Sequence, residues 1–195
     1  FKNPLDARKY IPADYDGQRF AKAIFYCANG ASCFDIDPAK LYDNMPLDLI
    51  YKFHSYKNHD LYCRHCASRE WGEQRLKNGE KLLNDIITKA DEAIAGGKGA
   101  ADLRFGHDYP LLTLCSALHL EPFPWGYSFD EVDGLWSCST MCMGSNLQMI
   151  FYRSKKAGKP VLVKFLYNEK ETKITGLDSE LGFYYDWEKV KNFVR

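Results

Sequence analysis

The sequence contains no long apolar run, no excess of charge of either sign, and no internal repeat or low-complexity segment. Because a membrane-spanning helix needs about 18 or more apolar residues in succession, no membrane span is predicted. The 26 basic and 26 acidic residues balance, so no global field attracts nucleic acid, and any anion site must be local. What is present is a globular composition: 195 residues, 46% of them hydrophobic, enough for one domain or for one domain and a smaller lobe.

Seven cysteines are too few for a dense disulfide scaffold, and their odd number leaves at least one unpaired. The run Cys63-Arg64-His65-Cys66 has the C-x-x-C spacing of a redox pair or of half a zinc site, with Cys138 and Cys142 as further candidate ligands. No strand pattern precedes this run, and Cys138 and Cys142 are not spaced as a second C-x-x-C pair. The sequence therefore favours structural thiols or a local disulfide over a zinc or redox site.

Residues 1–95 show helical periodicity and no convincing β-alternation. The strongest helix is predicted over 75–95, where apolar residues recur at helical spacing and Gly96-Gly97 provides a stop. Shorter helices are predicted around 20–26 and 47–53. This half is predicted to be a helical lobe.

The pattern changes after Gly99 to one that mixes strands and helices. The expected elements are a strand at 101–105, a tight loop at 106–108, a helix carrying Leu111 to Leu118, strands at 147–152 and 161–167, a hairpin turn at 168–171, a strand at 172–174, and a helix capped by Asp186. Residues 96–195 are therefore predicted to form part of an α/β domain.

Gly106-His107-Asp108 lies between the expected strand and the expected helix. The first N–H groups of a helix lack intrahelical partners and attract anions, so a phosphate suits this place. His107 could donate a hydrogen bond to a phosphoryl oxygen, Asp108 could protonate a departing alkoxide, and Gly106 lets the backbone approach closely. The spacing alone equally fits Asp108 as a helix cap and His107 as the partner of a loop carbonyl.

Three segments in order resemble the histidine acid phosphatases, branch two of the histidine phosphatase superfamily, and most of all their inositol polyphosphate phosphatase members. They are Leu103-Arg104-Phe105-Gly106-His107-Asp108 followed by Leu111-Leu112-Thr113-Leu114, then 144–153, then 163–170. The resemblance implies the C-terminal part of a three-layer α/β phosphatase domain, with the helical lobe as part of the family's inserted α-domain. Asp108 follows His107 directly, as in phytase-like relatives, whereas eukaryotic inositol polyphosphate phosphatases place one residue between this histidine and a glutamate.

The family forms a phosphohistidine on a histidine in an N-terminal Arg-His-Gly-x-Arg-x-Pro loop, and the sequence lacks this motif. Its one Arg-His pair, Arg64-His65, continues with Cys66 instead of glycine. Phe1 to Asp6 also contain no initiator methionine and nothing resembling a signal peptide. We therefore expect the C-terminal portion of a longer phosphatase, inactive or nearly so alone, that needs its N-terminal half or self-associates through exposed strand edges.

In the complete enzyme, the resemblance implies that His107 binds the transferring phosphoryl group and Asp108 protonates the leaving oxygen of a phosphomonoester such as an inositol polyphosphate. Gly106, Asn168 and Lys170 are expected to contact substrate, without a metal or another cofactor. A secreted or periplasmic location is expected from the family. The alternatives are a non-catalytic anion-binding or interaction module and, less favoured, a zinc or redox protein.

Overall fold

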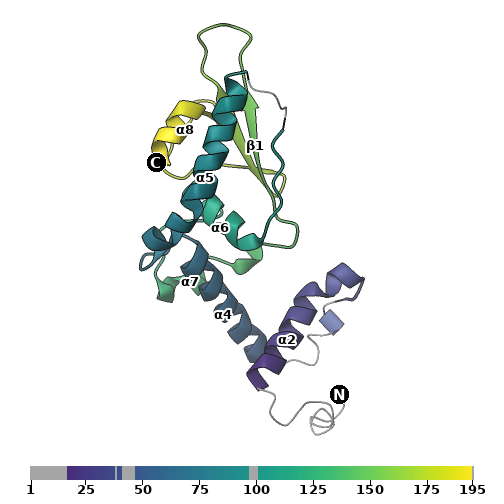
Figure 1. Cartoon of the computed structure of the whole chain (residues 1–195). Helices are drawn as coiled ribbons and strands as arrows, with labels where there is room; N and C mark the ends of the chain where they lie inside the picture. The colour runs from purple at the N-terminus through teal and green to yellow at the C-terminus, as the bar shows by residue number, and fades with distance from the viewer. Residues whose placement is uncertain (1–16, 38, 41–46, 97–100, 195) are drawn as a thin grey trace. The chain divides into compact units, whose positions relative to one another are not determined.

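A computed structural model describes residues 17–37, 39–40, 47–96 and 101–194 (Figure 1). Its contacts divide the chain into two compact units, Phe1–Tyr56 and Lys57–Arg195. The boundary between the units falls at residues 56 and 57, before the change in sequence pattern at residue 96. The helix that precedes residue 96 packs on the helix that follows it, so both belong to the second unit. In the described ranges no helix is both long enough and apolar enough to cross a bilayer.

The first unit contains helix α2 (Gly17–Gly30), a 3₁₀ turn at Ala31–Phe34, and the start of α4 (Leu47–His65). The rings of Phe25 and Phe53 stack with centroids 5.4 Å apart and join α2 to α4. Around this contact Phe25 and Ala28 are buried. Both helices begin near the predicted residues and extend further than predicted.

The second unit contains the rest of α4 and the remaining elements. In chain order these are α5 (Gly72–Ile94), α6 (Asp108–Ala117), a 3₁₀ turn at Phe129–Glu131, α7 (Val132–Leu135), a 3₁₀ turn at Cys138–Thr140, β1 (Leu147–Tyr152), β2 (Leu162–Tyr167), β3 (Lys170–Thr172), β4 (Tyr184–Asp186) and α8 (Trp187–Phe193). Helices and a small antiparallel sheet make this an α/β fold, which confirms the predicted class.

The sheet is built around β2, which pairs antiparallel with β1, β3 and β4. The predicted hairpin is confirmed, although its turn is shorter than predicted: Tyr167 pairs with Lys170, leaving Asn168 and Glu169 at φ 48° and 65°. Two successive residues at positive φ are what a two-residue turn with the twist of the flanking strands requires. Side chains alternate along β2, so Val163 and Phe165 point into the core.

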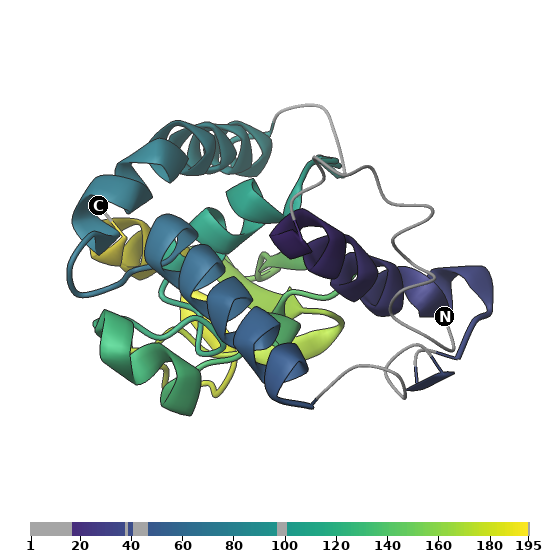
Figure 2. The same ribbon diagram turned by 90° about the horizontal axis from the view of Figure 1, so that it is seen from below.

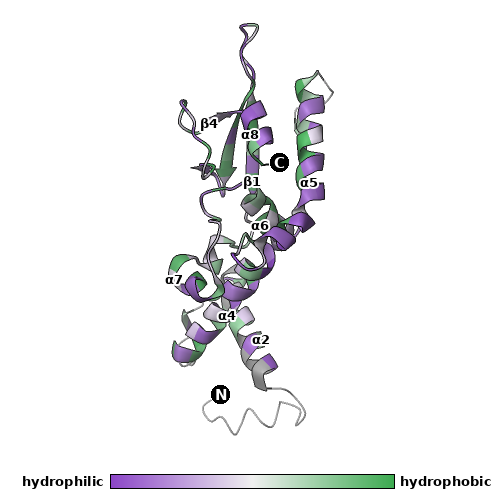
Figure 3. Cartoon of the chain, turned by 90° about the vertical axis from the view of Figure 1, so that its left-hand side faces the viewer, coloured by the Kyte–Doolittle hydropathy of each residue, from purple (hydrophilic) through white to green (hydrophobic). Residues whose placement is uncertain are grey.

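Helix α8 lies beside the sheet, with α5 on its outer side (Figure 3). The predicted cap is confirmed: the Asp186 side chain accepts hydrogen bonds from the backbone N–H groups of Glu188 and Lys189, at 2.9 and 3.4 Å. Lys191 then reaches back, and its Nζ lies 3.0 Å from both carboxylate oxygens of Asp91. This pair fixes α8 against the far end of α5.

Residues 101–105 do not form the predicted strand. They have no regular secondary structure and are exposed, and no strand of the described chain pairs with them; Leu103 and Phe105 expose 77% and 95% of their surface. An isolated segment cannot complete a hydrogen-bonded ladder, so its β-forming residues are insufficient without a neighbour. Arg104 holds the segment to α5 through Asp85, at 2.6 Å, and pairs locally with Asp102 at 2.7 Å.

Helix α6 packs closely on α5 where Gly79 faces Thr113. A Cβ at position 79 would lie 2.7 Å from Cγ2 of Thr113, closer than side chains tolerate. This close approach helps to fix the position of α6 and therefore of the residues at its N-terminus.

Gly79→Ala is expected to destabilise the second unit by about 1 to 3 kcal/mol, because overpacking outweighs the better helix propensity of alanine. Thr113→Ser removes Cγ2 but retains the hydroxyl that donates to the carbonyl of Tyr109, so the double variant should recover most of the loss. Urea denaturation of the four proteins measures this coupling. Gly134→Ala, with open space around its Cβ, is the control; an equal loss there would contradict the steric explanation.

Candidate functional site

His107 and Asp108 lie where the exposed segment enters α6. His107 is the residue before the helix, with φ −96° and ψ 163°, and Asp108 is the first helical residue. Oδ1 of Asp108 accepts a hydrogen bond from the backbone N–H of Tyr109 at 2.9 Å and contacts Nδ1 of His107. Asp108 is thus not the residue that precedes the helix, as the capping alternative would have it. The side chains of His107 and Asp108 are 69% and 36% exposed, so both can meet a ligand from solvent.

Gly106 is exposed, and no atom lies within 4 Å of the position of a Cβ there. No packing contact within the described chain therefore requires glycine at this position. The open space beside it is compatible with the predicted approach of substrate to the backbone.

The second half of α4 lies against the start of α6 (Figures 1 and 2). The imidazole of His65 stacks on the ring of Tyr109 with centroids 4.2 Å apart and an interplanar angle of 4°. Nζ of Lys57 lies 5.9 Å from the centroid of the same ring. Tyr109 also contacts the ring of His107, with centroids 4.7 Å apart and an interplanar angle of 44°. Tyr109 is therefore the ring that links α4 to His107.

Charges on α4 lie close to this stack. Asp60 pairs with Arg64 at 2.8 Å and with Lys57 at 3.7 Å. Burial and the nearby Arg64 lower the pKa of His65, while the carboxylates of Asp60 and Asp108 act in the opposite direction. His65 is thus electrostatically connected to the candidate site, which the sequence pattern did not indicate.

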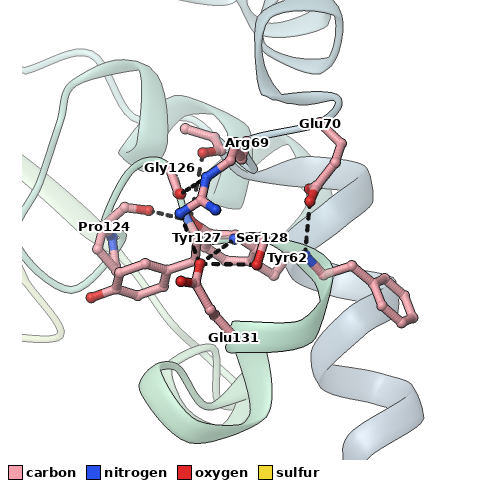
Figure 4. A network of polar contacts seen from close by, with 10 residues as sticks. Tyr62, Arg69, Glu70, Pro124, Gly126, Tyr127, Ser128 and Glu131 are labelled. Atoms are coloured by element: carbon pink, nitrogen blue, oxygen red, sulfur yellow. Dashed lines mark hydrogen bonds and ion pairs between the residues drawn. The ribbon is translucent and has the colours of Figure 1, made fainter.

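The loop that follows α6 is fixed to the end of α4 by a network of polar contacts (Figure 4). The Tyr62 hydroxyl donates to the carbonyl of Pro124 at 2.7 Å. Arg69 binds the carbonyl of Gly126 at 3.0 Å and the carboxylate of Glu131 at 2.9 Å. Because Tyr62 lies one helical turn before His65, these contacts help to hold the end of α4 beside α6.

Asn168 is occupied in a structural contact. Its side-chain oxygen accepts from the backbone N–H of Asn146 at 2.9 Å, and its amide donates to Oγ of Ser145 at 3.3 Å. It therefore closes the loop that leads into β1. Lys170 is exposed at the start of β3. Across the described ranges no hydrogen bond or ion pair joins Asn168 or Lys170 to His107 or Asp108, and their contact with substrate stays a prediction.

The cysteines of the C-x-x-C run are buried free thiols. Burial raises the pKa of Cys63 to about 11 and that of Cys66 to about 12, which opposes formation of the reactive thiolate. Within the part of the chain that the structure describes, no three His, Cys, Asp or Glu side chains are grouped to hold a metal ion. The burial and the raised pKa values favour structural thiols over the redox alternative.

Two solved structures share this arrangement of elements: the multiple inositol polyphosphate phosphatase of Bifidobacterium longum in its apo form and in its complex with phosphate. Both match with a TM-score of 0.69 and 17% sequence identity over 82% of this chain. The chain has the fold of part of a multiple inositol polyphosphate phosphatase. This match confirms the predicted resemblance at the level of the fold.

The chain spans about a third of the length of the Bifidobacterium phosphatase structures, 35% of one and 34% of the other. No family model and no curated protein matches its sequence. The comparison with the phosphatase structures therefore depends on the arrangement of helices and strands.

Proposed function

We propose that this chain supplies His107 and Asp108 to a histidine acid phosphatase that hydrolyses phosphomonoesters, with inositol polyphosphates as the substrate class. The observation that carries the proposal is the exposed His107–Asp108 pair at the start of α6, in a fold shared with an enzyme whose structure was solved with phosphate. Its proposed location is secreted or periplasmic, as the resemblance implies.

The chemistry available at the pair is hydrogen bonding and proton transfer. The imidazole of His107 donates to an oxygen of the transferring phosphoryl group, and the first N–H groups of α6 add to the attraction for the anion. Asp108, in its protonated form, gives its proton to the leaving alkoxide as the P–O bond breaks. Positioned proton transfer contributes roughly 10² to 10⁴ in rate, which alone does not make an efficient phosphatase.

The nucleophile is proposed to come from another polypeptide segment, because the 195 residues contain no Arg-His-Gly-x-Arg-x-Pro motif. Nucleophilic attack by that histidine would form the phosphohistidine, and water would then release phosphate. The exposed segment 101–105 supports the need for a partner. Leu103 and Phe105 are large apolar side chains two residues apart, and both are exposed, so they are available to a partner.

Calorimetry of the 195-residue chain with inositol hexakisphosphate and inorganic phosphate tests the anion site. We expect weak binding that is lost in His107→Ala, and phosphatase turnover after addition of a polypeptide that carries the Arg-His-Gly-x-Arg-x-Pro motif. The non-catalytic module, which the missing motif also supports, predicts binding without turnover even after that addition. Rapid turnover by the chain alone, unaffected by His107→Ala, would refute the assignment.

A further inference from the structure

His65 has no role in the proposed chemistry, yet it stands at the candidate site. It is the last residue of α4, and its ring lies flat on Tyr109, the residue that follows Asp108. Tyr109 in turn contacts the ring of His107. A displacement of the His65 ring would therefore be transmitted to the first turn of α6.

The surroundings of His65 make its charge responsive to pH. Its Nε2 is buried and has no hydrogen-bond partner in the described structure, which disfavours the protonated ring. Arg64 and Lys57, on the same helix, also oppose a positive charge, whereas Asp60 on α4 and Asp108 on α6 favour it. Burial is the largest of these effects, so the pKa of His65 is lowered and the ring becomes charged in acid solution.

We propose that His65 is a positioning residue of the candidate site, which holds the first turn of α6 through Tyr109 and, once protonated, adds a positive charge beside Asp108 that favours a bound phosphate. This inference rests on the proposed function for its ligand. It identifies a residue of the C-x-x-C run as part of the anion site, and it predicts that an anion of fixed charge binds more tightly in acid.

The electrostatic connection can be tested without any ligand. Histidine resonances of the full 195-residue chain, followed by NMR from pH 4 to pH 8, give the pKa of His65 in the wild type, in Asp108→Asn and in the exposed control Asp178→Asn. Loss of the Asp108 charge should lower the pKa of His65, because a carboxylate that favours the protonated ring is removed, and the control should leave it unchanged. An unchanged value in Asp108→Asn would overturn the proposal, whatever the protein's function.

The effect on the anion is tested with sulfate, which keeps its charge between pH 5 and pH 7.5. His65→Phe retains a ring against Tyr109 without charge, and His65→Arg retains a stacked planar group with a permanent charge. Between pH 7.5 and pH 5 the increase in sulfate affinity should be roughly two- to fivefold smaller in His65→Phe than in the wild type. In His65→Arg the affinity should be high at both pH values. A wild-type pH profile in His65→Phe would overturn the role of His65, whereas absence of sulfate binding by the wild type would count against the proposed anion site itself.

Discussion

Asp108→Asn should reduce hydrolysis of inositol hexakisphosphate by roughly 10²- to 10⁴-fold in the enzyme assembled with its nucleophilic segment, because the amide has no acidic proton to give to the leaving alkoxide. Asparagine has nearly the same shape, and its oxygen can still accept from the N–H of Tyr109, so the start of α6 should be preserved. The loss should therefore appear in kcat, with little change in folding.

The leaving group provides the control for this prediction. Nitrophenolate departs without protonation, so p-nitrophenyl phosphate should lose far less activity in Asp108→Asn than the inositol substrate does. Steady-state kinetics on both substrates, with Asp178→Asn as an exposed acid in the same unit, measure the difference. Equal losses on the two substrates would show that Asp108 acts on the phosphoryl group or on folding instead of on the leaving oxygen.

Local sequence signals predicted most of the second unit. Helix α5 spans 72–94, close to the predicted 75–95. The prediction succeeds because apolar spacing and a glycine stop can both be recognised within one continuous segment. The β2–β3 hairpin and the Asp186 cap were predicted for the same reason. Strand β4 was missed, because three residues carry no usable periodicity and their conformation depends on pairing with β2.

The predicted strand at 101–105 failed for the opposite reason. Its residues have the right composition, but a strand also requires a hydrogen-bonded neighbour, and none of the described strands pairs with it. Strand formation is thus decided by partners that local sequence does not reveal.

The site could be predicted only in part. The His107–Asp108 pair was accessible from sequence because a glycine, a helix start and two chemically suited residues are adjacent in the chain. His65 was not, because its place on Tyr109 depends on how α4 packs against α6. The two cysteines near it in sequence, at C-x-x-C spacing, suggested redox or zinc chemistry instead. Both are buried in the structure, which opposes a reactive thiolate.

One buried amide, that of Asn58 on α4, also contributes to the packing that supports the site, and it is 1% exposed. Its oxygen accepts from the backbone N–H of Cys138 at 2.7 Å, and its nitrogen donates to the carbonyl of Trp136 at 3.3 Å and to Asp133 at 3.1 Å. The Asn58 side chain thus serves as the hydrogen-bond partner of two backbone groups in the loop after α7, the N–H of Cys138 and the carbonyl of Trp136, and it connects α4 to that loop.

Asn58→Ala should destabilise the second unit by about 3 kcal/mol, because a buried donor and a buried acceptor lose their partners and a small cavity is left. With a urea m-value of about 2 kcal/mol/M, the unfolding midpoint should fall by roughly 1.5 M. Asn84→Ala on the exposed face of α5 is the matched control and should change stability by less than about 0.5 kcal/mol. If both variants unfold at the wild-type midpoint, the amide of Asn58 does not hold α4 to this loop, and the support of His65 and Tyr109 must come from the Tyr62 and Arg69 contacts instead.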